Sequence, residues 1–211
     1  MSLSIVVATD EQGGIGKDME IPWYIREDMC RFKEITTKKQ KHTPILNCMN
    51  SNSNHDFNWL IMGATTFSSL PIILSHRNHM ILSRTSSRKG TKNSLLWLET
   101  EAKTKVAWVS NIKSVIQYWL KEEAEAFVIG GEAIYKQMLP YVDTIYLTEI
   151  QGTYGANKFF KYNKEEFEII ECSDWKIEKS LYNIDEYKFR FKTLKRKGEI
   201  KLWLIQLTTL Q

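Results

Sequence analysis

A short apolar run, two glycines and the start of a helix follow one another in Phe127-Val128-Ile129-Gly130-Gly131-Glu132-Ala133-Ile134-Tyr135. Such a turn presents backbone N–H groups and the positive end of the helix to an anionic ligand such as phosphate. A plain strand-to-helix connection is an equally good interpretation of this segment alone. In either case a buried strand leading into a helix is the unit from which parallel α/β sheets are built.

The same alternation of strand and helix extends over the first 150 residues. Strands are predicted at Leu3–Thr9, Trp59–Met62, His79–Ser83, Val106–Val109, Ala126–Gly130 and Thr144–Ile150, and helices at Tyr24–Thr36, Thr65–Ser69, Ser114–Lys121 and Glu132–Leu139. Two later runs, Phe167–Cys172 and Glu186–Leu194, predict an antiparallel hairpin that completes the sheet. The sequence therefore predicts an α/β fold with right-handed crossovers.

Bulk composition indicates one domain of a cytoplasmic protein. The chain has 211 residues, 43% of them hydrophobic, and a net charge of +4 that is too dispersed to suggest nucleic-acid binding. Its three cysteines are far apart and form no CxxC pattern, which argues against disulfides and a zinc site. We expect neither a signal peptide nor a membrane span at the N-terminus.

Two segments interrupt or extend this predicted domain, which covers residues 1–197. Residues 38–58 are polar and lack apolar periodicity, so they are predicted to be a surface insertion. Residues 198–211 form an apolar C-terminal extension after a glycine. This extension could dock on the domain or lead to a further domain to which the chain is fused or with which it associates.

Asp28 stands within an apolar helical stripe. The stripe consists of residues at steps of three and four: Ile25, Met29, Phe32 and Ile35. Removing water from an unpaired carboxylate costs several kcal/mol. Because of this cost, a carboxylate at such a position either has a partner or takes part in chemistry. The alternative is that Glu27 and Asp28 only stabilise the first turn of the helix through its dipole.

Glycines and hydroxyl residues suggest further ligand contacts. Gly13-Gly14-Ile15-Gly16-Lys17 is not a phosphate-binding P-loop, because Glu11 and Asp18 replace the required residues. It is predicted to be a flexible loop that brings backbone close to a flat ligand. Met62-Gly63-Ala64-Thr65-Thr66 is a second strand-to-helix turn and a second candidate phosphate site.

Taken in order, these segments, with Ile21-Pro22-Trp23, Leu82-Ser83-Arg84 and Tyr146-Leu147-Thr148, resemble the dihydrofolate reductase family over about residues 3 to 194. The resemblance implies a mostly parallel eight-stranded sheet flanked by helices, with a C-terminal antiparallel strand. It also implies an enzyme of one-carbon metabolism that reduces dihydrofolate to tetrahydrofolate. Hydride passes from NADPH to C6 and N5 is protonated through water. Antifolates would be its inhibitors.

The resemblance assigns the substrate site around Asp28. Asp28 would accept hydrogen bonds from the pterin, Thr148 would hydrogen-bond Asp28, and Trp23 would help to hold the ordered water. Arg77 would bind the α-carboxylate of the substrate's glutamate, a suitable role for a bidentate donor. The apolar walls of the site would be Val6, Met29, Phe32, Leu70, Leu74 and Ile129.

The resemblance also assigns an NADPH site. Ser83 and Arg84 would bind the 2′-phosphate, and the loop from Gly13 to Trp23 would close over the nicotinamide. The assigned cofactor residues are Ala8, Ile15, Gly16, Ile21, Gly63, Ala64, Thr65, Thr66, Ser83, Arg84, Gly130, Gly131, Glu132, Ala133, Ile134 and Tyr135.

Ala64, Asn157, Lys161 and the short segment between Pro71 and Arg77 depart from the family pattern. Ala64 replaces a basic residue near the adenosine phosphate, which places more weight on Arg84, and Asn157 replaces the usual aspartate. Two alternatives therefore stay open. One is a pyrimidine reductase of riboflavin synthesis with the same fold, which would have less need of Arg77 and of the Trp23–Asp28 pair. The other is a non-catalytic protein that binds pterin or nucleotide.

Overall fold

The computed structural model describes residues 2–37, 57–84, 96–99, 104–122, 125–179 and 186–198. Nearly all of the predicted insertion at 38–58 and of the extension at 198–211 lies outside these ranges. The strands are β1 Leu3–Thr9, β2 Gly14–Gly16, β3 Trp59–Gly63, β4 Asn78–Leu82, β5 Leu96–Glu99, β6 Lys105–Val109, β7 Ala126–Gly130, β8 Thr144–Ile150, β9 Lys158–Phe159, β10 Phe167–Cys172, β11 Lys176–Lys179 and β12 Glu186–Arg196. The α-helices are α1 Arg26–Thr37, α2 Ala64–Ser69, α3 Ile112–Glu122 and α4 Glu132–Met138, and two 3-10 turns are η1 Leu139–Tyr141 and η2 Lys164–Glu166.

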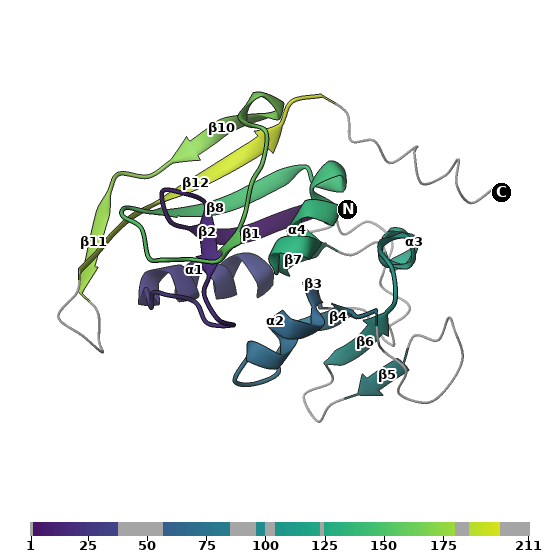
Figure 1. Ribbon diagram of the computed structural model, residues 1–211. Coiled ribbons are helices and arrows are strands. Elements are labelled where there is room, and N and C mark those ends of the chain that lie inside the picture. Colours follow the sequence, from purple (N-terminus) through teal and green to yellow (C-terminus); the bar gives the residue numbers. More distant parts are fainter. Residues whose placement is uncertain are drawn as a thin grey trace, which may run out of the picture.

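One large sheet organises the described part of the chain (Figure 1). Its order is β10-β12-β8-β1-β7-β3-β4-β6-β5, with β11 also paired to β12. The inner strands from β8 to β6 are parallel, whereas β12, β10, β11 and β5 pair antiparallel. The predicted fold class is confirmed. The sheet has ten strands rather than eight, because β5 adds an edge and the C-terminal hairpin continues past Cys172 into β11.

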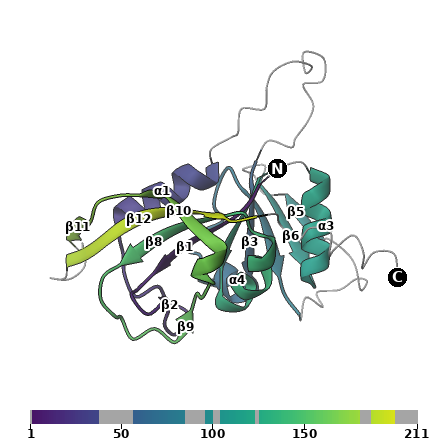
Figure 2. The same ribbon diagram turned by 90° about the horizontal axis from the view of Figure 1, so that it is seen from above.

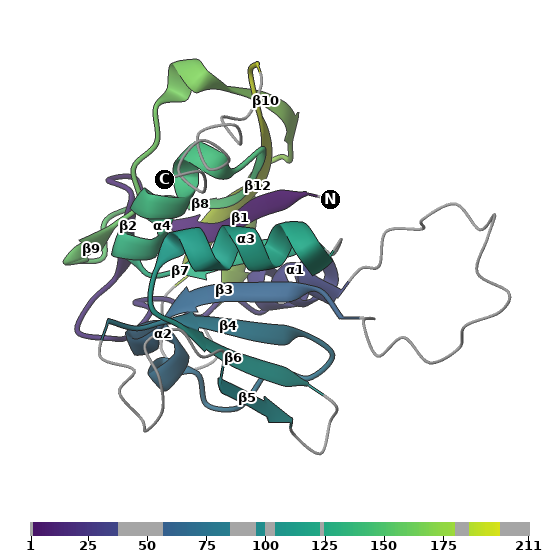
Figure 3. The same ribbon diagram turned by 90° about the vertical axis from the view of Figure 1, so that its right-hand side faces the viewer.

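Helices cover both faces of this sheet. Odd-numbered residues of β1, such as Ile5, pack with residues of α3 and α4, whereas Val6 belongs to the cluster that includes residues of α1 and α2. This alternation follows from the two-residue period of a strand. Figure 3 shows α3 and α4 on the near side of the sheet and α1 on the far side. No described helix is long and apolar enough to cross a membrane.

The apolar stripe predicted for α1 is only partly buried. Ile25 is buried just before the helix and Phe32 is half-buried, but Met29 is 51% exposed. The part of the stripe at Met29 is therefore a wrong prediction. The residues that α1 turns toward the sheet are Asp28, Arg31, Phe32 and Ile35, which recur at steps of three and four, and the helix begins at Arg26 rather than at Tyr24.

The glycine-rich loop after β1 makes several internal contacts. The Asp10 carboxylate accepts hydrogen bonds from the Gly14 N–H at 2.7 Å and the Gln12 N–H at 2.9 Å. A Cβ on Gly14 would lie 2.5 Å from Cβ of Ala156, so only glycine permits this approach. β2 then pairs with β9, and backbone hydrogen bonds between Lys17 and Glu20 close a tight turn.

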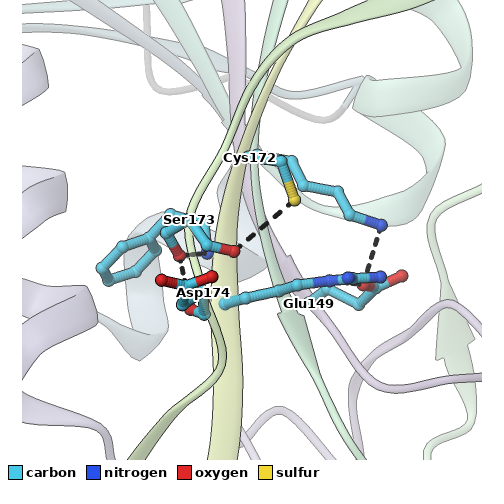
Figure 4. A network of polar contacts seen from close by, with 7 residues as sticks. Glu149, Cys172, Ser173 and Asp174 are labelled. Carbon is cyan, nitrogen blue, oxygen red and sulfur yellow. Dashed lines mark hydrogen bonds and ion pairs between the residues drawn. The ribbon is translucent and has the colours of Figure 1, made fainter.

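The bend between β10 and β11 is fixed to β12 by Ser173. Its backbone N–H donates to the Phe191 carbonyl at 2.9 Å, and its hydroxyl accepts from the Phe191 N–H at 3.0 Å. Figure 4 shows this bend beside Glu149, whose carboxylate binds Arg190 and Lys192 of β12. The bend directs β11 along β12 toward the beginning of α1, as Figure 2 shows from above.

Candidate active site

Asp28 and Thr148 face each other between α1 and β8. The Thr148 hydroxyl donates to Oδ1 of Asp28 at 2.5 Å, which confirms the predicted contact. Burial raises the pKa of the Asp28 carboxyl, and the Thr148 hydrogen bond and the charge of Arg31 partly oppose this rise. A carboxylate in this setting is oriented by one neighbour and keeps its other oxygen for a ligand.

Trp23 stands just before α1 and packs as part of a buried cluster. Its indole is 6% exposed and meets the Tyr154 ring edge-on, with 5.5 Å between ring centres. The same cluster contains Ile25, Tyr187 and Phe189, with Ala8 at its margin. Trp23 is therefore a packed residue of this cluster that precedes Asp28 closely in the chain, and its proposed contact with water stays a prediction.

Arg77 is anchored at the far end of α1. Its Nη1 donates to Thr36 Oγ1 at 3.2 Å and its Nε to the Ser75 carbonyl at 3.0 Å. The residue is only 5% exposed, and burial lowers the pKa of its guanidinium. Among the described residues, Arg77 donates side-chain hydrogen bonds through Nε and Nη1 but not through Nη2, so Nη2 keeps its capacity to bind an anion.

The predicted apolar walls come together on the sheet face that α1 covers. Val6, Leu70, Leu74 and Ile129 are all half-buried members of one cluster, in which Ile35 and Tyr146 also pack. Phe32 lies half-buried on the facing side of α1. Sequence reasoning omitted Ile35 and Tyr146 from the site, although Ile35 stands one helical turn after Phe32 and Tyr146 two residues before Thr148.

The two glycine turns that were predicted to bind phosphate lie side by side. A Cβ on Gly131 would be 3.3 Å from Thr66 Oγ1, and one on Gly63 would be 3.2 Å from the side chain of Ile134. Gly130 has φ of +128°, a conformation that glycine adopts readily. The carboxyl ends of β3 and β7 therefore place the first residues of α2 and α4 around one point, as expected for neighbouring parallel strands.

The other predicted cofactor residues border this point to different degrees. Tyr135 is buried and its hydroxyl donates to the Val6 carbonyl at 3.0 Å, which links α4 to β1. Ser83 and Arg84 follow the carboxyl end of β4, and the Arg84 side chain is exposed. Ala8, Ile15, Gly16, Ala64 and Gly131 are half-buried, whereas Ile21, Thr65, Glu132 and Ala133 are exposed.

Asn157 binds the loop that was predicted to close over the site. Its side-chain amide donates to Asp18 Oδ1 at 2.9 Å, and its backbone N–H donates to the Gly16 carbonyl at 3.0 Å. An asparagine can donate to this carboxylate, whereas an aspartate at the same position would repel it. The asparagine at position 157 is therefore suited to its partner in this chain, the carboxylate of Asp18.

Two charged residues near Asp28 were missed by the sequence reasoning. Arg31 lies one turn later on α1, and Glu178 reaches the first turn of α1 from β11. The spacing of Arg31 from Asp28 was a usable signal, because residues three apart share a helix face. Glu178 gave no local signal. Among the described residues no group of acidic, cysteine or histidine side chains could bind a metal ion.

Comparisons with known proteins agree on one family. The family model described as dihydrofolate reductase matches residues 2–41 and 53–196. A type 9 dihydrofolate reductase of Escherichia coli is 30% identical over 187 residues, which cover 89% of this chain and 88% of that protein. The dihydrofolate reductase of Haemophilus influenzae is 31% identical over 170 residues, or 80% of this chain and 85% of that protein.

A solved structure shows the same fold. It is a dihydrofolate reductase from Enterococcus faecalis complexed with NADP(H) and RAB-propyl. The TM-score is 0.67 and the sequence identity 22%, over 93% of this chain and 97% of that chain.

Proposed function

Because this chain belongs to the dihydrofolate reductase family, we propose that it catalyses the NADPH-dependent reduction of 7,8-dihydrofolate to tetrahydrofolate. The chain is thus an oxidoreductase that acts on a small molecule. The observation that carries the proposal is the carboxylate of Asp28, half-buried and held by Thr148 between α1 and β8.

In this proposal Asp28 recognises the pterin ring. Its carboxylate accepts charge-assisted hydrogen bonds from the ring's amino group and N3, which are stronger than neutral ones and fix the orientation of a flat ligand. The cluster around Val6, Leu70 and Leu74 packs against the ring systems and excludes bulk water. Trp23 helps to place the water through which N5 is protonated. Arg77 binds the glutamate α-carboxylate through Nη2.

The residues at the ends of β3 and β7 fit a dinucleotide. An added side chain at Gly63, Gly130 or Gly131 would meet close neighbours, and in this proposal the backbone N–H groups at the start of α2 and α4 bind the pyrophosphate. Ser83 and Arg84 bind the 2′-phosphate. Position 64 does not contribute a basic side chain, because it is occupied by Ala64. When bound, NADPH supplies the hydride, and the protein contributes orientation and electrostatics.

The test follows the oxidation of NADPH by absorbance with dihydrofolate present. We expect turnover in the wild-type protein, and the absence of turnover would contradict the proposal. Asp28→Asn should lose about a hundredfold or more of the activity near neutral pH and recover part of it in acid, where the substrate is already protonated. Dihydrofolate turnover would exclude the non-catalytic alternative. A riboflavin-pathway pyrimidine substrate, tested in parallel, should not be reduced.

A second test addresses the cofactor. Replacing Arg84 with glutamine should reduce the preference for NADPH over NADH by about tenfold, because a charge-assisted contact to phosphate is lost. An unchanged preference would refute the role of Arg84. Antifolate binding, measured as a rise in Tm, should need Asp28. A single domain over residues 1–197, a cytoplasmic location and a further domain beyond the extension remain predictions.

A further inference from the structure

The helix that carries Asp28 is fixed at its beginning by a residue 152 positions away. Glu178 of β11 accepts hydrogen bonds from the Arg26 N–H at 2.6 Å and from the Glu27 N–H at 3.1 Å. These are orphan donors that a local N-cap side chain normally satisfies. Lys176 of the same strand forms an ion pair with Glu27. The strand β11 thus holds the two residues that immediately precede Asp28.

Arg31 is fixed on the other side of Asp28, three residues further along α1. Its guanidinium carbon lies 4.6 Å from the centre of the Phe191 ring and 5.8 Å from that of Tyr146. Its Nη2 lies 3.4 Å from the Lys192 carbonyl, which it contacts as a donor. A cation held over two aromatic faces has a defined position, which an exposed arginine lacks. Arg31 and Asp28 share one side of the helix.

These two residues bring opposite charges to the Asp28 carboxyl. Burial is the main cause that raises its pKa, and within the smaller contributions Arg31 lowers the pKa whereas Glu178 raises it. The neighbouring charged or titratable side chains are Glu27 and Glu34 on α1, Tyr135 on α4, Tyr146 on β8, Glu171 on β10, Lys176 on β11 and Lys192 on β12. Arg31 and Glu178 are the two charged side chains that act on Asp28 most directly.

We propose that Arg31 and Glu178 are positioning residues for Asp28, which hold the first two turns of α1 against the C-terminal strands and set, by their opposite charges, the pH range of the reductase. Neither residue needs to touch substrate or cofactor. The inference rests on the proposed function only where activity is the readout. Removal of the charge at Arg31 and at Glu178 is expected to shift the pH at which Asp28 ionises in opposite directions. Loss of packing alone would not produce opposite shifts.

The first experiment measures kcat/KM for dihydrofolate against pH in the full-length protein. Arg31→Gln should raise the pH midpoint assigned to Asp28 by about 0.5 to 1 pH unit, because a nearby cation is removed. Glu178→Gln, which keeps one oxygen acceptor for the helix, should lower the midpoint by about 0.3 pH unit. The double variant should return close to the wild-type value, and Arg31→Lys, which keeps the charge, should retain most of the wild-type profile.

Matched controls remove the same charges from exposed positions on α1 and on the β11–β12 hairpin. Lys33→Gln and Glu186→Gln should leave the midpoint where it is in the wild type, because neither side chain contacts the beginning of α1 among the described residues. A control that moves the midpoint as far as Arg31→Gln or Glu178→Gln would attribute the effect to net charge and overturn the proposal.

The second experiment reads the carboxyl directly. Carbon-13 NMR of aspartate-labelled protein, with Asp28→Asn for assignment, gives the pKa of Asp28 without any turnover. Opposite displacements in Arg31→Gln and Glu178→Gln support the inference even if the wild type fails to reduce dihydrofolate, in which case the proposed function alone fails. Unchanged values, or displacements in the same direction, overturn the inference while normal turnover leaves the proposed function intact.

Discussion

Substitution of His79 should flatten the acid side of this protein's stability profile. His79 is fully buried on β4, where its Nε2 accepts a hydrogen bond from the Leu74 N–H at 3.3 Å. Burial lowers its pKa from 6.5 to about 4, the charge of Arg77 adds to this, and a weak interaction with the Arg77 backbone partly opposes it. The imidazole is therefore neutral in the folded protein well below the pH at which it gains a proton in the unfolded chain.

The sign and size of the effect follow from linkage. Between pH 6.5 and about 4 the unfolded chain binds more protons at this residue than the folded protein does, so stability falls as pH falls. At about 1.4 kcal/mol per pH unit of difference, the whole penalty is about 3 kcal/mol, and most of it is reached by about pH 4.5. Protonation would also place a hydrogen on Nε2, which removes the acceptor of the Leu74 N–H.

Urea unfolding of wild type and His79→Gln at several pH values between about 7 and 4.5 measures this contribution. The variant is expected to be less stable at neutral pH, because the packing changes, but to lose about 2 kcal/mol less than wild type on acidification. Other groups, including Asp28, contribute equally to both proteins. His76→Gln, at an exposed position in the preceding turn, is the control and should follow wild type. Parallel curves for wild type and His79→Gln would refute the reasoning.

Three further outcomes are expected. Asp28→Asn should raise the free energy of unfolding near neutral pH, because burial raises the pKa of the carboxyl and its charge opposes folding there; equal or lower stability in urea would contradict this. Arg196→Lys should lower the unfolding free energy by about 2 kcal/mol, because the side chain loses its hydrogen bonds to the Val142 and Leu139 carbonyls, and a Tm equal to wild type would count against it. Asn157→Ala should lower kcat/KM for dihydrofolate about threefold with little change in Tm, since only its exposed hydrogen bond to Asp18 is lost; an unchanged kcat/KM would show that this contact does not act on the loop.

Much of the fold was predictable because it is encoded in short stretches. The predicted strands at Leu3–Thr9, Ala126–Gly130 and Thr144–Ile150 have the observed bounds, since continuous apolar runs bounded by turn residues are typical of buried parallel strands. The short strand β5 was missed, and β11 was missed because its alternation of charged and apolar residues reads as exposed polar chain. Met29 was misplaced because steps of three and four allow more than one choice of stripe, and α1 turns the side with Asp28, Phe32 and Ile35 inward.

The sequence by itself determined which chemical groups are available. An acid within an apolar stripe, a threonine at the end of a strand, an arginine before β4 and two glycine turns followed from residue types and spacing, and their order indicated the family. These are local properties, because propensity, periodicity and turn chemistry act over a few residues.

Only the tertiary structure decided how these groups are controlled. The beginning of α1 is held by Glu178 and Lys176, and the neighbours of Arg31 come from β8 and β12. Contacts between residues about 150 positions apart depend on strand order and register, which no local pattern specifies. The burial that raises the pKa of Asp28 and the opposite charges beside it are likewise set by packing. The sequence thus identified the carboxylate, whereas the tertiary structure sets its pKa.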